Sequence, residues 1–347
     1  MAFGWDVRQH RRLKTMTGAM TGAMAGRGAR ADRRLDGKLV VLTGGTGFFG
    51  AHVVQELLAR GARLRIVARA PEKAWRLRPL ANLGQLQFVR GDVTRPASLA
   101  AAFAGADAAV NLVGAFAGDL DALQGAGAGR IAALALGGGA RGFVHVSALG
   151  AEATSPIDYN RTKAAGEAAV LAAFPGATIL RPSVLFGADD AFVNLFAGLI
   201  AKLPVLPVFG PQAKLQPLYV DDAAQAVGSA LADPATHGGR RYDIAGPEPI
   251  AMIDLNRRIA AAQGRSRLFL ELPDAVSGGF AAATGWLPGA PLSSDQWALL
   301  RSGNVLAGVN GLDALGVVPR PLALFLDRWM VRYRKHGRFG TKVSPAA

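Results

Sequence analysis

The chain has 347 residues, of which 50% are apolar and 18% are charged, so it is long enough to bury one large core or two smaller ones. Its net charge of +14 is unevenly placed, because residues 1–38 and 328–347 each carry an excess of six positive charges. The segment between them is nearly neutral, which argues against a nucleic-acid binder with a basic groove. Basic tails of this kind are typical of segments that meet an anionic surface or partner.

Cysteine is absent, which excludes disulfide frameworks, thiol nucleophiles and cysteine-ligated metal sites. The five histidines show neither an HExxH pattern nor a paired spacing, so we expect no metal site. We expect no membrane-spanning segment, since polar or proline residues interrupt the two most apolar windows, 98–117 and 191–210. No apolar stretch of a secretory signal follows the basic start.

Residues 1–36 are rich in arginine and repeat Thr-Gly-Ala-Met at positions 17–24, which predicts a basic, disordered extension. An organellar presequence is one alternative, because this segment is also poor in acidic residues. A start codon assigned too early is the other, with Met16, Met20 and Met24 as later candidates.

Residues 37–249 alternate short apolar runs with helical spacing. Strands are predicted at 39–42, 64–68, 86–89, 108–113, 142–147 and 178–180. Helices are predicted from Phe49 up to Gly61, at 98–105 and 223–232, and in the stretch that contains Gly125, Gly127 and Gly129. The three glycines make that last helix less favourable, by about 1 kcal/mol each. This alternation predicts an α/β fold, a doubly wound parallel sheet of Rossmann type.

From residue 250 to 325 the pattern becomes amphipathic pieces separated by Pro and Gly, which predicts a smaller C-terminal lobe, partly interleaved with the sheet. Residues 326–347 form a basic tail, and aromatic and basic side chains are mixed between Phe325 and Phe339. Such a segment suits the interface of an anionic membrane, or an acidic protein partner. The alternative is a C-terminal helix that packs Trp329 against its own domain.

The turn after the first strand reads Thr-Gly-Gly-Thr-Gly-Phe-Phe-Gly and satisfies GxGxxG. Glycines at these positions let the chain turn tightly, let backbone N–H groups approach a pyrophosphate and let the helix pack close to the strand. A turn without ligand is the alternative. The motif follows a strand and opens a helix, so it predicts dinucleotide binding by Gly44, Gly45, Thr46, Gly47, Phe48, Phe49 and Gly50.

The second strand ends at Arg69, and no acidic residue follows before Glu72. An acid at this place binds the ribose hydroxyls of NAD, whereas a guanidinium suits a 2′-phosphate, so NADP(H) is favoured over NAD(H). The alternative for Arg69 is a solvated surface side chain. Residues at or just after the ends of the next two strands are also predicted to contact the nucleotide. They are Asp92, Val93, Asn111 and Gly114.

Tyr159 and Lys163 are four residues apart, and none of the other three tyrosines has a lysine at this spacing. A helix places both on one face, where a cation favours the phenolate. Tyr159 is therefore a candidate acid or base, and Lys163 its tuner and a donor to the ribose. Ser147, at the end of the fifth strand, is positioned to polarise a substrate carbonyl. A surface Tyr/Lys pair is the alternative.

Together these residues resemble the short-chain dehydrogenase/reductase superfamily, in its extended, epimerase-like branch. The resemblance runs from Lys38 to about Gly246 and rests on the glycine-rich turn, the YNRTK sequence at 159–163 and the LRPSVLFG sequence at 180–187. It implies a cofactor contact from Pro182 as well. Only eleven residues separate Ser147 from Tyr159, fewer than sugar-nucleotide epimerases and dehydratases usually have, so a sugar-nucleotide substrate is in doubt.

Segments 155–167, 292–305 and 332–339 are similar to the atypical group that contains the NADPH-binding accessory subunit of respiratory complex I and its bacterial relatives. This resemblance implies a largely structural nucleotide and docking on the peripheral arm near the membrane, on its cytoplasmic face or the organellar matrix side. It also implies a link to NADH:ubiquinone oxidoreductase or ubiquinone metabolism. The alternative is an active NADP-dependent reductase or epimerase that uses Ser147, Tyr159 and Lys163 on a small or lipid-like carbonyl substrate.

Overall fold

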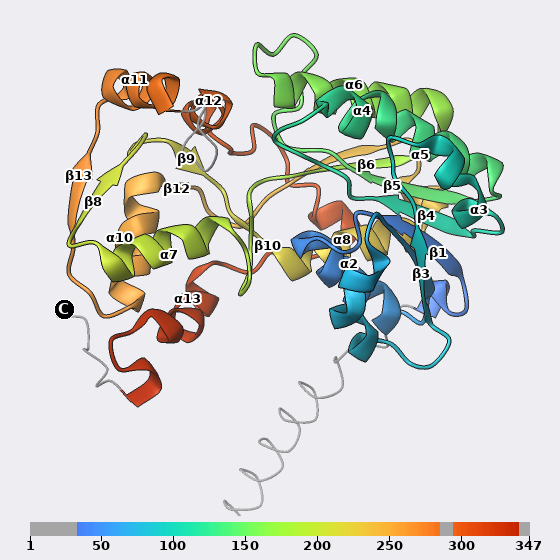
Figure 1. Ribbon diagram of the computed structural model, residues 1–347, viewed down its shortest axis with the longest axis horizontal. Coiled ribbons are helices and arrows are strands. Elements are labelled where there is room, and N and C mark those ends of the chain that lie inside the picture. The colour runs from blue at the N-terminus through green and yellow to red at the C-terminus, as the bar shows by residue number, and fades with distance from the viewer. Residues whose placement is uncertain (1–32, 285–293, 340–347) are drawn as a thin grey trace, which may run out of the picture.

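A parallel sheet forms the centre of the larger lobe (Figure 1). The computed structural model describes residues 33–284 and 294–339, and within them the sheet has seven strands. These are β1 (Leu39–Thr43), β2 (Arg63–Ala68), β3 (Leu86–Arg90), β4 (Ala108–Asn111), β5 (Gly142–Val146), β6 (Thr178–Pro182) and β11 (Arg241–Ile244). Their order is β11-β6-β5-β4-β1-β2-β3, and all neighbours are parallel. The predicted doubly wound sheet is confirmed, and β11 is a strand that the sequence pattern did not predict.

Helices cover both faces of the sheet because successive side chains of each strand point to opposite sides. In β1, Val40 and Leu42 pack in one core with α2 (Phe48–Ala59) and α8 (Val220–Ala232). Val41 packs in the other core with α3 (Ala100–Phe103), α5 (Ala126–Gly137) and α6 (Asp158–Ala173). All three β1 side chains are fully buried. Both faces are therefore apolar, and the polar side chains of a binding site are restricted to the ends of the strands.

The glycine-bearing stretch forms two helices instead of one, α4 (Leu120–Gln124) and α5, which meet at Gly125. Its glycines permit close packing against α6. A Cβ on Gly129 would lie 2.8 Å from the Cβ of Ala169, and a Cβ on Gly166 would lie 2.0 Å from the carbonyl oxygen of Gln124. The low helix propensity is therefore offset by a close approach that only glycine allows.

A smaller lobe has its own core, built from segments that are far apart in the chain (Figure 1). Its main elements are α7 (Phe192–Lys202), β8 (Val205–Val208), α10 (Met252–Ala262), β13 (Leu268–Glu271), α11 (Asp274–Thr284), α12 (Ser294–Ser302), α13 (Ala323–Trp329) and the 3-10 helix η5 (Met330–Tyr333). Between β8 and α10 the chain returns to the sheet for α8 and β11. The predicted interleaving is therefore present. The predicted boundary after residue 249 stays a prediction; α7 and β8, which precede it, pack in this lobe.

The remaining described elements are short. They are the 3-10 helices η1 (Arg33–Leu35), η2 (Pro71–Leu80), η3 (Pro96–Ser98), η4 (Asp313–Leu315) and η6 (Gly337–Phe339), the helix α9 (Pro234–His237), and the strands β7 (Leu185–Phe186), β9 (Lys214–Leu215), β10 (Leu218–Tyr219) and β12 (Ile250–Ala251). The predicted helix at 98–105 is reduced to η3 and α3. Most of the predicted N-terminal extension, residues 1–32, lies outside the described residues. No helix in the described ranges is long and apolar enough to cross a membrane.

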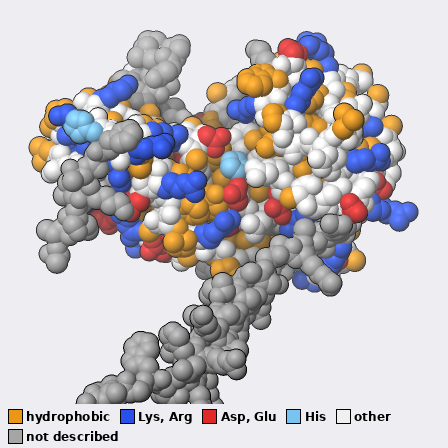
Figure 2. All heavy atoms as spheres, turned by 90° about the horizontal axis from the view of Figure 1, so that it is seen from below, with side chains coloured by type: hydrophobic (Ala, Val, Ile, Leu, Met, Phe, Trp, Pro, Cys, Tyr) orange, Lys and Arg blue, Asp and Glu red, His pale blue; other side chains and the backbone are white. Residues whose placement is uncertain are grey.

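The aromatic side chains near the C-terminus pack inward. Phe325 stacks on Tyr219 with ring centroids 4.1 Å apart, and Trp329 stacks on Phe325 at 4.8 Å. Met330 is buried in the smaller core. Of the two alternatives for this segment, packing of Trp329 against its own domain is what the structure shows. Arg328, Arg332, Lys335 and Arg338 are exposed in this segment, as is Asp327, and Figure 2 shows Lys and Arg side chains among hydrophobic ones on this side of the molecule.

Candidate nucleotide site

The glycine-rich turn joins β1 to α2 and requires glycine at two places. Gly44 has a φ of +79°, and a Cβ there would lie 2.9 Å from the backbone carbon of Leu112. A Cβ on Gly50 would lie 2.3 Å from the carbonyl oxygen of Gly44. The turn is therefore folded back against the first turn of α2, with Gly47 donating its N–H to the carbonyl oxygen of Gly44. This is the compact geometry that the sequence motif predicts for a pyrophosphate-binding turn.

The first turn of α2 has no side-chain cap, because Gly47 is its N-cap residue and is exposed. Backbone N–H groups at such an end, together with the helix dipole, favour an anionic ligand. Gly45 is buried beside Ile66, and Phe48 and Phe49 pack against the smaller core. The exposed part of the turn is thus Thr46 and Gly47.

Three arginines gather beside this turn at the ends of β2 and β3. Arg69 is exposed, which fits both a contact with a 2′-phosphate and the alternative of a solvated surface side chain. Arg90 donates to the carbonyl oxygen of Arg69 and pairs with Glu72 at 3.0 Å. Arg76, on η2, donates to the carbonyl oxygen of Thr46 at 2.6 Å. Sequence reasoning missed Arg76 and Arg90; their only signal was a basic stretch after the second strand.

Asp92 and Val93 follow β3. The Asp92 carboxylate accepts hydrogen bonds from the backbone N–H and the hydroxyl of Thr94, which lower its pKa below the usual value. Val93 is half-buried and packs on the core that faces α5 and α6. Asp92 is therefore ionised, and its side chain is held by the hydrogen bonds within its own turn. Its contact with the adenosine stays a prediction.

Asn111 ends β4 and is fully buried. Its Oδ1 accepts hydrogen bonds from the Thr43 hydroxyl at 2.8 Å and from the Val113 N–H at 3.1 Å, and its Nδ2 lies 3.1 Å from Nδ1 of His145. The side chain thereby ties together the ends of β1, β4 and β5. The sequence predicts a ribose contact for Asn111, whereas the structure gives it partners within the protein that shape the edge of the sheet.

Lys163 lies at the centre of the site. Its ammonium group is buried and donates to the carbonyl oxygens of Val146 at 3.2 Å and Val113 at 3.5 Å, so it bridges the ends of β4 and β5. Burial lowers the pKa of Lys163 to about 8, against the opposing effect of the Glu167 carboxylate. A Cβ on Gly114 would lie 3.1 Å from Nζ, so this predicted site glycine leaves room for the ammonium.

Tyr159 shares the face of α6 with Lys163, but its electrostatics differ from the prediction. Nζ of Lys163 lies 5.9 Å from the centroid of the Tyr159 ring. Burial raises the pKa of Tyr159 to about 12, so the phenol is neutral. Loss of hydration thus opposes the predicted preference for the phenolate, and the lysine ammonium is bound to backbone carbonyls.

Ser147 and Pro182 complete the predicted set. Ser147 directly follows β5, is 3% exposed, and its hydroxyl oxygen is buried without a hydrogen-bond partner among the described residues. A buried hydroxyl without a partner is unfavourable, so this oxygen suits a polar group of a ligand. Pro182 ends β6, and its carbonyl oxygen accepts the N–H of Leu149, which holds the loop after Ser147.

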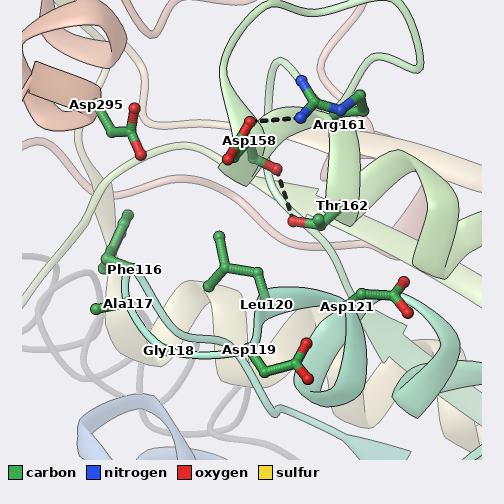
Figure 3. Close-up of a pocket in the computed structure, with 10 residues that line it drawn as sticks. All are labelled: Phe116, Ala117, Gly118, Asp119, Leu120, Asp121, Asp158, Arg161, Thr162 and Asp295. Atoms are coloured by element: carbon green, nitrogen blue, oxygen red, sulfur yellow. Dashed lines mark hydrogen bonds and ion pairs between the residues drawn. The ribbon is translucent and has the colours of Figure 1, made fainter.

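A cleft of about 370 Å³ opens beside Tyr159, between the loop after β4, the first turns of α6 and α12 of the smaller lobe (Figure 3). It is lined by Phe116, Leu120 and four aspartates, and Arg161 pairs with Asp158 across its upper wall. Asp295 is the residue that α12 contributes. The two lobes therefore form this cleft together.

Comparisons with known proteins agree with this site. Residues 44–190 match the NAD(P)H-binding family, and residues 150–277 match the RmlD substrate binding domain family. NADH dehydrogenase (ubiquinone) 1 alpha subcomplex subunit 9 of Arabidopsis thaliana is 30% identical over 328 residues, which are 89% of this chain and 82% of that protein. The chain belongs to the family of these subunit 9 proteins.

The subunit 9 protein of Rattus norvegicus is similar to the same degree, with 30% identity over 317 residues, 89% of this chain and 84% of its own length. An NADPH-dependent quinone oxidoreductase of Escherichia coli, solved with NADPH, has the same fold, with a TM-score of 0.66 at 18% identity over 83% of this chain and 99% of that chain. The predicted extended short-chain dehydrogenase/reductase relationship is confirmed, and the larger lobe is an NAD(P)H-binding domain.

Proposed function

We propose that this protein is an accessory or assembly subunit of NADH:ubiquinone oxidoreductase or of ubiquinone metabolism, and that it holds NADP(H) mainly as a structural ligand. The observation that carries this proposal is the similarity to subunit 9 proteins, which extends over both lobes and not only over the nucleotide domain. The neutral Tyr159 supports it further, because a phenol with a raised pKa is a poor proton donor at neutral pH.

The residues present fit a nicotinamide dinucleotide. Gly44 and Gly50 have no room for side chains, the first turn of α2 is uncapped, and the Ser147 hydroxyl has no partner in the described part of the chain. Thr46 and Gly47 would meet the pyrophosphate, and Lys163 the nicotinamide ribose. When bound, such a nucleotide supplies a hydride donor or acceptor. The preference for NADP(H) rests on Arg69, with Arg76 and Arg90 beside it.

For docking, we propose that the basic side of the smaller lobe faces an anionic membrane surface or an acidic surface of the peripheral arm. Arg328, Lys335 and Arg338 are exposed there, while the aromatic rings of Phe325 and Trp329 are turned into the lobe. The protein would then lie peripherally on the cytoplasmic face of the inner membrane, or on the matrix side in an organelle. Each basic residue near an anionic bilayer adds about 1 kcal/mol of binding.

Flotation with vesicles of anionic lipid tests the membrane arm of this proposal. The triple variant Arg328→Gln, Lys335→Gln, Arg338→Gln should lose binding, whereas the control Arg141→Gln, Arg257→Gln, Arg301→Gln removes the same charge from other exposed sites and should retain it. Equal flotation of both variants would refute the membrane contact.

An active reductase or epimerase is the second candidate, and the unpartnered Ser147 hydroxyl favours it, since this group is placed to polarise a carbonyl. Gentle purification separates the two. A structural nucleotide should stay bound through gel filtration and resist oxidation by quinones and aldehydes. Rapid exchange with multiple turnovers, lost in Tyr159→Phe, would overturn the accessory role in favour of catalysis.

A further inference from the structure

Phe116 is an aromatic residue on the surface with one conspicuous contact. It lies in the loop after β4, two residues beyond Gly114, and its side chain is 62% exposed. Its ring stacks on the ring of Tyr159, with centroids 4.6 Å apart and planes 16° from parallel. A large ring left in water is unfavourable, so the stacking contact is what holds it in this position.

The loop that carries Phe116 is tied to the helix that carries Tyr159. Gln124 is fully buried; its Oε1 accepts the N–H of Ala115 at 3.1 Å, and its Nε2 donates to the Thr162 hydroxyl at 3.0 Å. Thr162 in turn donates to the carbonyl oxygen of Asp158, in the first turn of α6. Because buried amides are held by their hydrogen bonds, the position of Phe116 over Tyr159 is built into the fold.

The Phe116 ring lies between the cleft that it lines and one face of the Tyr159 ring. Phe116 and its neighbours Ala117 and Gly118 line that cleft, together with Asp158 and Thr162 on either side of Tyr159 in α6, but Tyr159 itself does not (Figure 3). Tyr159 is half-buried, and Phe116 covers the face of its ring on which it stacks. The other neighbour of the ring, the Lys163 ammonium, is bound to the Val146 carbonyl oxygen.

We propose that Phe116 is a positioning residue that covers the Tyr159 ring and disfavours its phenolate form, so that a Ser147, Tyr159 and Lys163 set is retained in which Tyr159 is a weak acid and is not available as a phenolate base. This inference rests on the proposed structural role of the nucleotide, and it identifies the side chain that suppresses proton transfer. The groups around the phenol are consistent with it. Lys163 is the cation within 5.9 Å, Asp158 and Arg161 on the same helix pair with each other, and Asp295 of α12 lies across the cleft.

The test is the ionisation of Tyr159 in the full-length protein without nucleotide, so its result does not depend on nucleotide binding. Absorbance of tyrosinate is recorded against pH for each variant and for the same variant with Tyr159→Phe, and the difference isolates Tyr159. In the wild type the pKa should be about 12, and in Phe116→Ala it should fall by one to two units toward the ordinary value of about 10. Nitration of Tyr159 by tetranitromethane at pH 8, measured by mass spectrometry, should rise at least fivefold.

Phe116→Leu and Leu120→Ala serve as matched variants. Leu120 lines the same cleft without stacking on Tyr159, so its removal should leave the titration unchanged. Phe116→Leu keeps an apolar cover and should retain most of the raised pKa. The inference is overturned when Phe116→Ala titrates and nitrates like the wild type, or when Leu120→Ala exposes Tyr159 equally. Failure of NADP(H) to bind would instead count against the proposed function and leave this titration interpretable.

Discussion

Nδ1 of His52 lies 2.5 Å from Oδ1 of Asp221, which joins the helix after the glycine-rich turn to the first turn of α8. The other oxygen of Asp221 accepts the hydroxyl of Tyr219, whose ring stacks on Phe325 of the C-terminal helix. Arg320 lies over the same Tyr219 ring and pairs with Asp222. The nucleotide-binding helix is thus connected to the C-terminal helix by a chain of three side-chain contacts, from His52 through Asp221 and Tyr219 to Phe325.

This pair predicts a pH-dependent contribution to stability. Burial lowers the pKa of His52, but its bonds to Asp221 and Asp189 outweigh that effect and raise it above the usual 6.5. Protonated His52 therefore stabilises the fold below pH 6.5. This stabilisation is lost as the pH rises through the pKa of His52 in the folded state. His52→Gln should lower the free energy of unfolding in urea by about 1 kcal/mol at pH 5.5, and by less at pH 8.5. The exposed His336→Gln is the control, and an equal effect at both pH values would contradict the assignment.

His145 predicts the opposite behaviour in acid. It is fully buried, and loss of hydration lowers its pKa to about 3. The unfolded chain binds a proton near pH 6.5 while the folded chain does not, so stability falls as pH drops through this window. Between pH 6.5 and 4.5, the His145→Gln variant should lose about 2 kcal/mol less unfolding free energy than the wild type. Parallel acid limbs for variant and wild type would show that His145 is protonated in the fold.

Arg69, directly after β2, and Arg76, on η2, predict nucleotide choice. A charge-assisted bond to a 2′-phosphate contributes about 1.5 kcal/mol, or roughly tenfold in affinity. Arg69→Ala and Arg76→Ala should each weaken binding of NADPH by about tenfold in calorimetry, with NADH affected less. Arg141→Ala, at an exposed site on the opposite half of the sheet, should change neither. Equal losses for NADPH and NADH would assign these arginines to the pyrophosphate instead.

Two glycines in helices predict opposite effects of the same substitution. In Gly129→Ala the new methyl would lie 2.8 Å from the Ala169 side chain and 3.1 Å from its carbonyl oxygen, so α5 and α6 must separate. We expect a loss of about 1–3 kcal/mol of unfolding free energy. Gly198 lies inside α7 with open space around its Cβ position, so Gly198→Ala should stabilise by about 0.5–1 kcal/mol. The pair is measured by urea unfolding, and stabilisation by both would refute the close contact.

The sheet and the turn could be predicted because their signals are local. Apolar runs and glycine spacing found the first six strands and the turn at Gly44 to Gly50. The smaller lobe was harder, since α7 and β8 share a core with α13, which lies more than one hundred residues further along the chain. No local pattern reports such a contact.

The residue types of the site could be predicted from the sequence, but the contacts that these residues make could not. The spacing of Tyr159 and Lys163 predicts one helix face, which is what α6 shows, but hydrogen bonds to Val113 and Val146 hold the lysine elsewhere. No sequence pattern singled out Gln124 or Phe116. The role of a buried amide or of a surface ring depends on which residues it contacts in three dimensions. Arg76 depends likewise on how η2 folds over the turn.

Late segments of the chain complete both cores. Leu312, Leu315 and Val317 are buried in the core beneath the sheet, and Leu326 and Met330 in that of the smaller lobe. During synthesis neither lobe can therefore close until the last tenth of the chain has left the ribosome. A nascent chain must keep two unfinished apolar surfaces from aggregating until then, and a nonsense mutation upstream of Leu312 would leave both lobes open.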